Sequence, residues 1–112
     1  MDRKEMVRQY KETPRPAGVF LVRHTPTGRT LIGSSPDAPA MLNRIRAQLR
    51  MKGHPNRELQ RDWDNGDPSD FAFDVLDLVE QDDQSASDLA AELEGLEAMW
   101  REELGLLESS SY

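Results

Sequence analysis

Gly18-Val19-Phe20-Leu21-Val22 and Thr30-Leu31-Ile32-Gly33-Ser34-Ser35 are the two segments that decide the fold. Both carry β-branched or aromatic residues, and the intervening Thr25-Pro26-Thr27-Gly28 has the composition of a turn, so the pair predicts a β-hairpin. Gly18 and Gly33 lie inside the strands rather than in the turn. A glycine inside a strand marks a bulge or a close approach of another group. The two glycines therefore indicate either a binding site or crowding against a helix.

Length and composition limit the class of protein. The 112 residues predict one domain with a modest core. Cysteine is absent, which excludes disulfides and thiolate metal sites. No apolar run approaches the roughly 18 residues of a membrane-spanning helix, and the first residues lack the apolar stretch of a signal peptide. We therefore expect a cytoplasmic protein that does not contact a membrane.

Charge is distributed unevenly along the chain. The net charge is −7, but residues 1–61 hold 13 Lys and Arg against 5 Asp and Glu, whereas residues 62–112 hold 1 against 16. Such asymmetry indicates a basic face that meets an anion, and nucleic acid is the obvious candidate. The alternative is that the two halves pair with each other across the fold or within a dimer. A pI near 4.8 is low for a dedicated DNA-binding protein.

The rest of the chain extends the hairpin into an α+β domain. The expected elements are a helix at 2–12, strands at 18–22 and 30–35, a helix at 38–51, a short helix opening at Pro55-Asn56, a strand at 71–79 and a helix at 86–104. Asp37, Asn56 and Ser85 are the expected N-caps, and Gly53 is expected to end the second helix. This order, α-β-β-α-α-β-α, predicts a small three-stranded antiparallel sheet flanked by helices. We divide the chain into a helix and linker at 1–16, a domain at 17–105 and a C-terminal tail at 106–112, whose last residues, 109–112, are expected to fray.

This arrangement resembles the GIY-YIG nuclease family over about residues 17–100. Gly18-Val19-Phe20 stands at the first signature of that family and Leu31-Ile32-Gly33-Ser34-Ser35 at the second. The similarity continues at His54-Pro55-Asn56, Leu59-Gln60-Arg61-Asp62-Trp63, Phe71-x-Phe73-x-Val75-Leu76 and Glu97-Ala98-Met99-Trp100. The layout is similar to short standalone bacterial members.

The resemblance implies a function as well as a fold. Members of the family cut a phosphodiester bond in DNA. A tyrosine on the hairpin helps to generate the nucleophile, an arginine on the next helix steadies the phosphate charge, and a glutamate on the late helix holds Mg²⁺ or Mn²⁺. A metal ion and an arginine together neutralise the charge that builds up on the phosphate.

This chain departs from the family at four polar positions. The signature tyrosines correspond to Phe20 and Leu31, and the helix arginine and histidine positions correspond to Met41 and Ile45. None of these side chains can donate or accept a proton. We therefore expect the pocket to have closed into core.

Other residues could supply the missing groups. Arg44, one helical turn after Met41, could replace the catalytic arginine, or it could be an exposed residue that pairs with the acidic half. Glu97 stands at the metal position, although a glutamate on so acidic a helix is more often solvated. His54 could bind phosphate or transfer a proton, but a cap of the next helix is the simpler interpretation. The expected nucleic-acid contacts are Arg44, Arg46, Arg50, Lys52, Arg57 and Arg61. Trp63 and Trp100 are expected in the core and His24 at the surface.

Three hypotheses follow from the sequence. The first is a nuclease-fold protein that acts on nucleic acid, with DNA expected, and cuts it slowly or not at all. The second is an active Mg²⁺-dependent endonuclease that uses Arg44, Glu97 and His54. The third is a non-enzymatic module that binds a protein partner through the acidic last helix. The sequence leaves the oligomeric state open.

Overall fold

The computed structural model of this chain describes residues 16–79, 85–106 and 110–112. In chain order the elements are β1 (Ala17–His24), β2 (Thr30–Ser35), α2 (Ala38–Arg50), α3 (Arg57–Asn65), a 3₁₀ turn (Pro68–Asp70), β3 (Phe71–Val79) and α4 (Ala86–Glu103). The expected helix at 2–12 lies outside the described residues. The expected order of elements from the first strand onward is confirmed, and only the 3₁₀ turn was not foreseen. No helix within the described ranges is long and apolar enough to cross a membrane.

The three strands form one antiparallel sheet in the order β2-β1-β3. In this register Phe20 of β1 lies opposite Gly33 of β2 and Val75 of β3. The pairing of β1 with β3 shifts between Val19 and Phe20, which marks a β-bulge. A three-stranded antiparallel sheet flanked by helices is the α+β arrangement that the sequence predicts.

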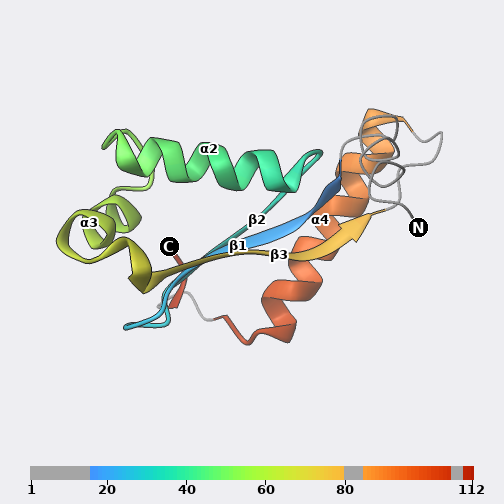
Figure 1. The fold of residues 1–112 in the computed structure, drawn as a ribbon. Helices are drawn as coiled ribbons and strands as arrows, with labels where there is room; N and C mark the ends of the chain where they lie inside the picture. Colours follow the sequence, from blue (N-terminus) through green and yellow to red (C-terminus); the bar gives the residue numbers. More distant parts are fainter. Residues whose placement is uncertain (1–15, 80–84, 107–109) are drawn as a thin grey trace, which may run out of the picture.

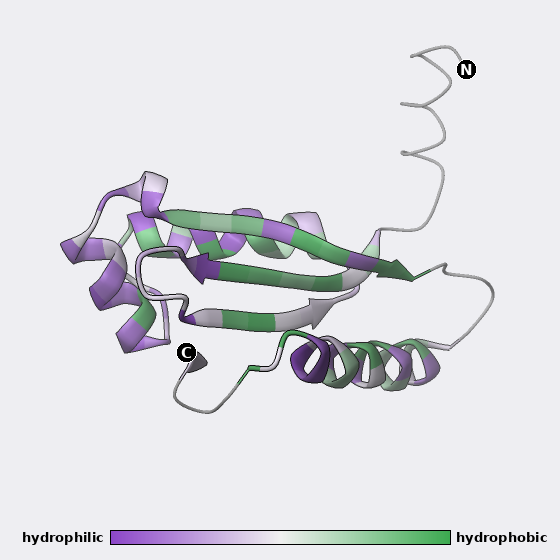
Figure 2. Cartoon of the chain, turned by 90° about the horizontal axis from the view of Figure 1, so that it is seen from below, coloured by the Kyte–Doolittle hydropathy of each residue, from purple (hydrophilic) through white to green (hydrophobic). Residues whose placement is uncertain are grey.

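Helices cover both faces of the sheet. Side chains alternate along a strand, so Phe20 and Val22 of β1 point to one face, where they pack with Leu42, Ile45 and Leu49 of α2 and Leu59 of α3. Ala17 points to the other face and packs with Val79 and with Leu93 of α4. Figure 1 shows α2 and α3 on one side of the strands, and Figure 2 shows α4 next to the β2 edge of the sheet, apart from α2 and α3. The sheet therefore separates α2 and α3 from α4.

The helices begin at the expected caps. The side chains of Asp37, Asn56 and Ser85 accept a backbone N–H from the first turn of α2, α3 and α4. The end of α2 differs from the expectation. Lys52, not Gly53, has the left-handed backbone conformation there, with φ of 60°, and the N–H groups of Lys52 and Gly53 donate to Leu49 and Gln48.

Both strand glycines are explained by crowding within the sheet, not by crowding against a helix as one interpretation of the sequence had it. A Cβ atom at Gly33 would lie 2.7 Å from Cζ of Phe20, and one at Gly18 would lie 2.0 Å from the carbonyl oxygen of Asp77. Real Cβ atoms do not approach other heavy atoms so closely. Gly33 makes room for the Phe20 ring, and Gly18 makes room for the β3 backbone beside the bulge.

The last residues do not fray, and the expectation of a frayed tail is wrong for Ser111 and Tyr112. Ser111 forms a parallel bridge with Thr30, and the N–H of Tyr112 donates to the Thr30 carbonyl at 3.0 Å. The Tyr112 ring packs against the α2–α3 core. The end of the described chain therefore joins the edge of β2.

Candidate nucleic-acid interface

The four positions at which the sequence departs from the family lie together on the α2 side of the sheet. Phe20 and Ile45 belong to one buried cluster, and Leu31 and Met41 pack against it. Only 5% of Phe20 is exposed. Hydrocarbon side chains fill this region, so it offers no proton donor or acceptor at the place where the family resemblance implies catalytic groups.

One face of α3 pairs with the hairpin. Glu58 and Asp62 are four residues apart and so lie on the same face of the helix. Arg29, just before β2, forms an ion pair with Glu58, and its Nη1 lies 3.8 Å from Oδ2 of Asp62. One arginine thus contacts both carboxylates of this helix face.

A polar cluster surrounds Asp62. The Tyr112 hydroxyl donates to Oδ2 of Asp62 at 2.5 Å, and Nδ1 of His24 lies 4.0 Å from the same oxygen. Burial, followed by the bond to Asp62, raises the pKa of the Tyr112 hydroxyl, which stays protonated. The Arg29 guanidinium lies 4.8 Å from the centre of the Tyr112 ring. This cluster fastens α3, the hairpin and the end of the described chain together.

His24 is buried, and the expectation that it is exposed is wrong. Only 8% of its surface is accessible. Its ring lies 4.8 Å from the Phe71 ring, centre to centre, and Nδ1 is 2.8 Å from Oγ1 of Thr27. Since β1 continues to residue 24 and pairs with β3 there, His24 is a strand residue beneath α3 rather than part of the turn.

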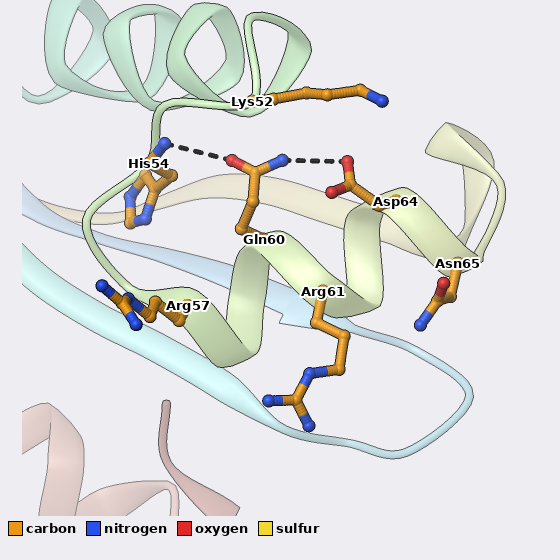
Figure 3. Close-up of a pocket in the computed structure, with 7 residues that line it drawn as sticks. All are labelled: Lys52, His54, Arg57, Gln60, Arg61, Asp64 and Asn65. Carbon is orange, nitrogen blue, oxygen red and sulfur yellow. Dashed lines mark hydrogen bonds between the residues drawn. The ribbon is translucent and has the colours of Figure 1, made fainter.

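The basic side of α3 faces an open depression of about 430 Å³. Figure 3 shows Arg57 and Arg61 extending from the helix, with Lys52 and His54 on the loop that precedes it. The lining residues are Lys52, His54, Arg57, Gln60, Arg61, Asp64 and Asn65. The structure thus brings together three of the six predicted nucleic-acid contacts and His54.

Gln60 holds the floor of this depression in place. Its amide oxygen accepts the His54 N–H, and its amide nitrogen donates to the Leu49 carbonyl and to Oδ1 of Asp64, each at 3.0 Å (Figure 3). These bonds tie the loop after α2 to the middle of α3. The basic side chains therefore extend from a loop and a helix that hydrogen bonds hold together.

His54 contacts the residue that caps α3. Its Nδ1 accepts the N–H of Asn56 at 3.0 Å, so in the neutral ring the proton is on Nε2. Burial lowers the pKa of this imidazole below its usual value. Asn56 is the N-cap of α3, as expected. The simpler interpretation, that His54 caps the helix itself, is therefore wrong in its detail: His54 is bonded to the cap residue.

The arginines of α2 lie at the edge of the same face. Arg44 and Arg50 are exposed, whereas Arg46 is half-buried, with its guanidinium carbon 4.5 Å from the centre of the Phe73 ring. Every ion pair within the described ranges involves Arg29 or His24. None of the six predicted basic contacts is compensated there by a carboxylate within 4 Å, so the alternative of pairing with the acidic half is not realised in the described part of the chain.

Glu97 lies apart from these groups. It is half-buried on α4, which packs against the opposite face of the sheet from Arg44. No group of three His, Cys, Asp or Glu side chains that could hold a metal occurs among the residues that the structure describes. Mg²⁺ prefers oxygen ligands in octahedral geometry. It also keeps several waters, so one carboxylate together with substrate phosphates can bind it. Glu97 could supply that carboxylate, but it lies across the sheet from Arg44, so the residues predicted for metal and for phosphate do not form one site.

The sequence reasoning missed the contacts of Arg29, Asp62 and Tyr112. One signal was available, because Glu58 and Asp62 alternate with Arg57 and Arg61 around a helix of nine residues. That spacing puts Glu58 and Asp62 on a different face from Arg57 and Arg61, although Asp64 shares the face of the two arginines. It does not reveal which face meets the hairpin.

Comparison with known proteins agrees with this fold. No protein-family model matches the sequence, and no curated protein matches it. The catalytic domain of homing endonuclease I-TevI is 19% identical, with a TM-score of 0.66 over 86% of this chain and 95% of that chain. A mutant of the catalytic domain of intron endonuclease I-TevI is 18% identical, with a TM-score of 0.67 over 87% of this chain and 91% of that chain. The residue motifs and the strand and helix order thus lead to the same conclusion: this chain has a GIY-YIG-like fold.

Proposed function

We propose that this protein binds nucleic acid on the face formed by α2, the following loop and α3, and does not cut it. The observation that carries the proposal is the distribution of charge on α3. Arg29 pairs with Glu58 and Asp62. In the depression, Lys52, Arg57 and Arg61 outnumber the one lining carboxylate, Asp64, which accepts a hydrogen bond from Gln60. Lysine and arginine side chains without carboxylate partners are available to phosphates.

The distribution of charge favours one orientation of the protein on a nucleic acid. The six basic side chains lie on the side of the sheet that carries α2 and α3. The helix α4 on the other side carries six carboxylates: Asp88, Glu92, Glu94, Glu97, Glu102 and Glu103. A polyanion is attracted to the first side and repelled by the second. The acidic pI of the whole chain is therefore compatible with a local basic interface.

The apolar substitutions argue against cleavage. Phe20, Leu31, Met41 and Ile45 form or line a hydrocarbon core, so no described side chain there can activate water. His54 is committed to Asn56 through Nδ1. Binding without hydrolysis is the function that these side chains support best.

The test compares the two faces of the protein in a titration with duplex and single-stranded DNA. The variant Lys52→Ala/Arg57→Ala/Arg61→Ala removes three cations from the depression. We expect an affinity loss of at least about tenfold. The plot of log K against log salt concentration should also become less steep, with the magnitude of its negative slope falling by up to ~3. The matched control, Glu94→Gln/Glu102→Gln, changes exposed carboxylates on α4 and leaves the slope unchanged. Equal salt slopes in the wild type and the triple variant would exclude this interface.

The same purified protein can be used to test the two other hypotheses, an active endonuclease and a protein-interaction module. Supercoiled DNA is incubated with Mg²⁺ or Mn²⁺ and scored for nicking, with Glu97→Ala as the control. Nicking that disappears in Glu97→Ala would establish the active endonuclease with relocated groups. The absence of both nicking and a gel shift at low salt would support the protein-interaction module.

A further inference from the structure

Arg46 and Phe73 form a flat surface beside the basic face. The Arg46 guanidinium lies over the Phe73 ring, 4.5 Å from its centre. The Trp63 ring meets Phe73 edge-on, with 6.2 Å between ring centres, and lies 5.2 Å from the Phe71 ring. A guanidinium held against an aromatic ring is fixed in orientation, so it loses little freedom when a second planar group stacks there.

This pair lies at an edge of the molecule that a ligand can reach. β3 is an edge strand of the sheet, and Phe73, Arg46 and Trp63 are each only half-buried. Val75, two residues along the same strand face, is 39% exposed. The strand therefore presents planar and apolar surface next to the arginines of α2.

Cations flank the flat surface. Arg50 is four residues after Arg46 and so projects from the same side of α2, and it is exposed. The chain then leads through Lys52 to the depression on α3. A planar surface beside a row of cations is the combination that binds a strand of nucleic acid with its bases unstacked.

We infer that this interface binds single-stranded nucleic acid, with one base stacked on the Arg46–Phe73 pair and the neighbouring phosphates held by Arg50, Lys52 and the arginines of α3. The inference rests on the proposed function and names its substrate class. In a duplex the faces of the bases are covered by their neighbours, so a duplex can use only the phosphate contacts. A single strand can use both.

The experiment separates base stacking from phosphate binding. Three ligands of equal length are titrated against the protein: a single-stranded thymidine oligonucleotide, the same strand with abasic sites, and a duplex. We expect the thymidine strand to bind about tenfold more tightly than the abasic strand, because only the thymidine strand has a base that can stack on the Arg46–Phe73 pair. The duplex should bind more weakly than the thymidine strand.

Two variants test whether the preference for the thymidine strand depends on Arg46 and Phe73. Arg46→Lys keeps the charge but removes the planar group, and Phe73→Leu keeps an apolar side chain but removes the ring. Each should reduce the ratio of thymidine to abasic affinity to nearly one while leaving abasic binding within about twofold. Arg101→Lys, on α4 across the sheet, is the matched control and keeps the ratio. Thermal unfolding of each variant verifies that it is folded.

The outcomes separate this inference from the proposed function. Equal affinity of the wild type for the thymidine and abasic strands, with salt-dependent binding of both, would overturn the stacking inference and leave the basic interface intact. An unchanged ratio in both Arg46→Lys and Phe73→Leu would also overturn it. Failure of all three ligands to bind at low salt would overturn both proposals.

Discussion

The two sides of the sheet are built differently. On one side, α2 and α3 close over a cluster of eight buried residues that includes Leu49 and Leu59, both fully inaccessible. On the other side, α4 is held by a cluster of three: Ala17, Val79 and Leu93. The larger cluster lies beneath the basic surface and the smaller one beneath the acidic helix. The candidate interface therefore rests on the larger of the two buried clusters, and side chains mounted on a packed core have well-defined positions.

Charge pairing differs between the two sides as well. Glu58 and Asp62 of α3 pair with Arg29, whereas the α4 contacts with the sheet contain no ion pair among the described residues. The neutral indole of Trp100 donates to Asp77 at 3.1 Å, and the guanidinium of Arg101 donates to the Ile32 backbone carbonyl at 3.4 Å. The first arrangement leaves cations free on the α3 surface. The second leaves most carboxylates of α4 in solvent.

The strongest test of this contrast removes one leucine from each side. Leu49→Ala leaves a cavity in the larger cluster and should lower the free energy of unfolding by about 3–4 kcal/mol. Leu93→Ala should lower it by about 2 kcal/mol, because fewer neighbours surround it. Urea unfolding measures both values. A larger loss for Leu93→Ala would show that α4, not α2 and α3, anchors the fold.

Replacing one glycine on each side of the sheet should give the next largest change in stability. Gly33→Ala brings a methyl group against the Phe20 ring and should destabilise the protein by about 2 kcal/mol. Gly95, within α4, has open space around it, so Gly95→Ala should instead stabilise by up to about 1 kcal/mol. Thermal unfolding measures both changes.

A double variant isolates the cause of the first effect. Phe20→Leu shortens the side chain that meets the new methyl group, so it should reduce the effect of Gly33→Ala in a double-mutant cycle. Additive changes in the cycle would mean that the crowding lies elsewhere.

Tyr112→Phe tests the polar cluster on the α3 side. The variant removes the donor to Asp62 but keeps the ring against the core. We expect a loss of about 1 kcal/mol, since Asp62 retains Arg29. Amide exchange should also accelerate at Tyr112, whose N–H donates to Thr30. Unchanged stability and exchange would show that the end of the chain contributes nothing to this side.

The smallest effect is a pH dependence from His54. Its pKa in the folded protein is lowered by burial, so the unfolded chain takes up a proton first as the pH falls below about 6.5. The contribution of His54 to stability is therefore present above that pH and decreases below it. His54→Asn keeps an acceptor for the Asn56 N–H but does not titrate. As the pH is lowered from about 7.5 to about 5.5, the unfolding midpoints of the wild type and of His54→Asn should converge, because only the wild type loses the contribution of His54. A constant difference between the two midpoints would contradict this role of His54.

Much of the fold was predictable because its signals are local. Asp37, Asn56 and Ser85 cap the helices at the expected places, and the alternation of Phe71 and Phe73 marked β3. The errors share one cause. His24 and Tyr112 are placed by contacts with Asp62 and Phe71, which are distant in sequence, and no local pattern encodes them.

The candidate site was predictable in composition but not in arrangement. The six basic residues stand out in the sequence, but the sequence does not show that Arg29 is the residue that pairs with Glu58 and Asp62 of α3. Arg46 was expected to contact phosphate, and only the structure places it over Phe73. Trp63 was expected in the core, and it packs against the core while remaining half-buried.

The residue pattern alone predicts the α+β class, the order of the elements, the helix N-caps and the apolar character of Phe20, Leu31, Met41 and Ile45. Those properties follow from side-chain chemistry and from hydrogen bonds that span a few residues. Only the tertiary structure decided which carboxylates are neutralised, which cations remain available and which ring lies beneath Arg46. These depend on the sheet, which brings the hairpin, α3 and the last residues together and places α4 on the opposite face.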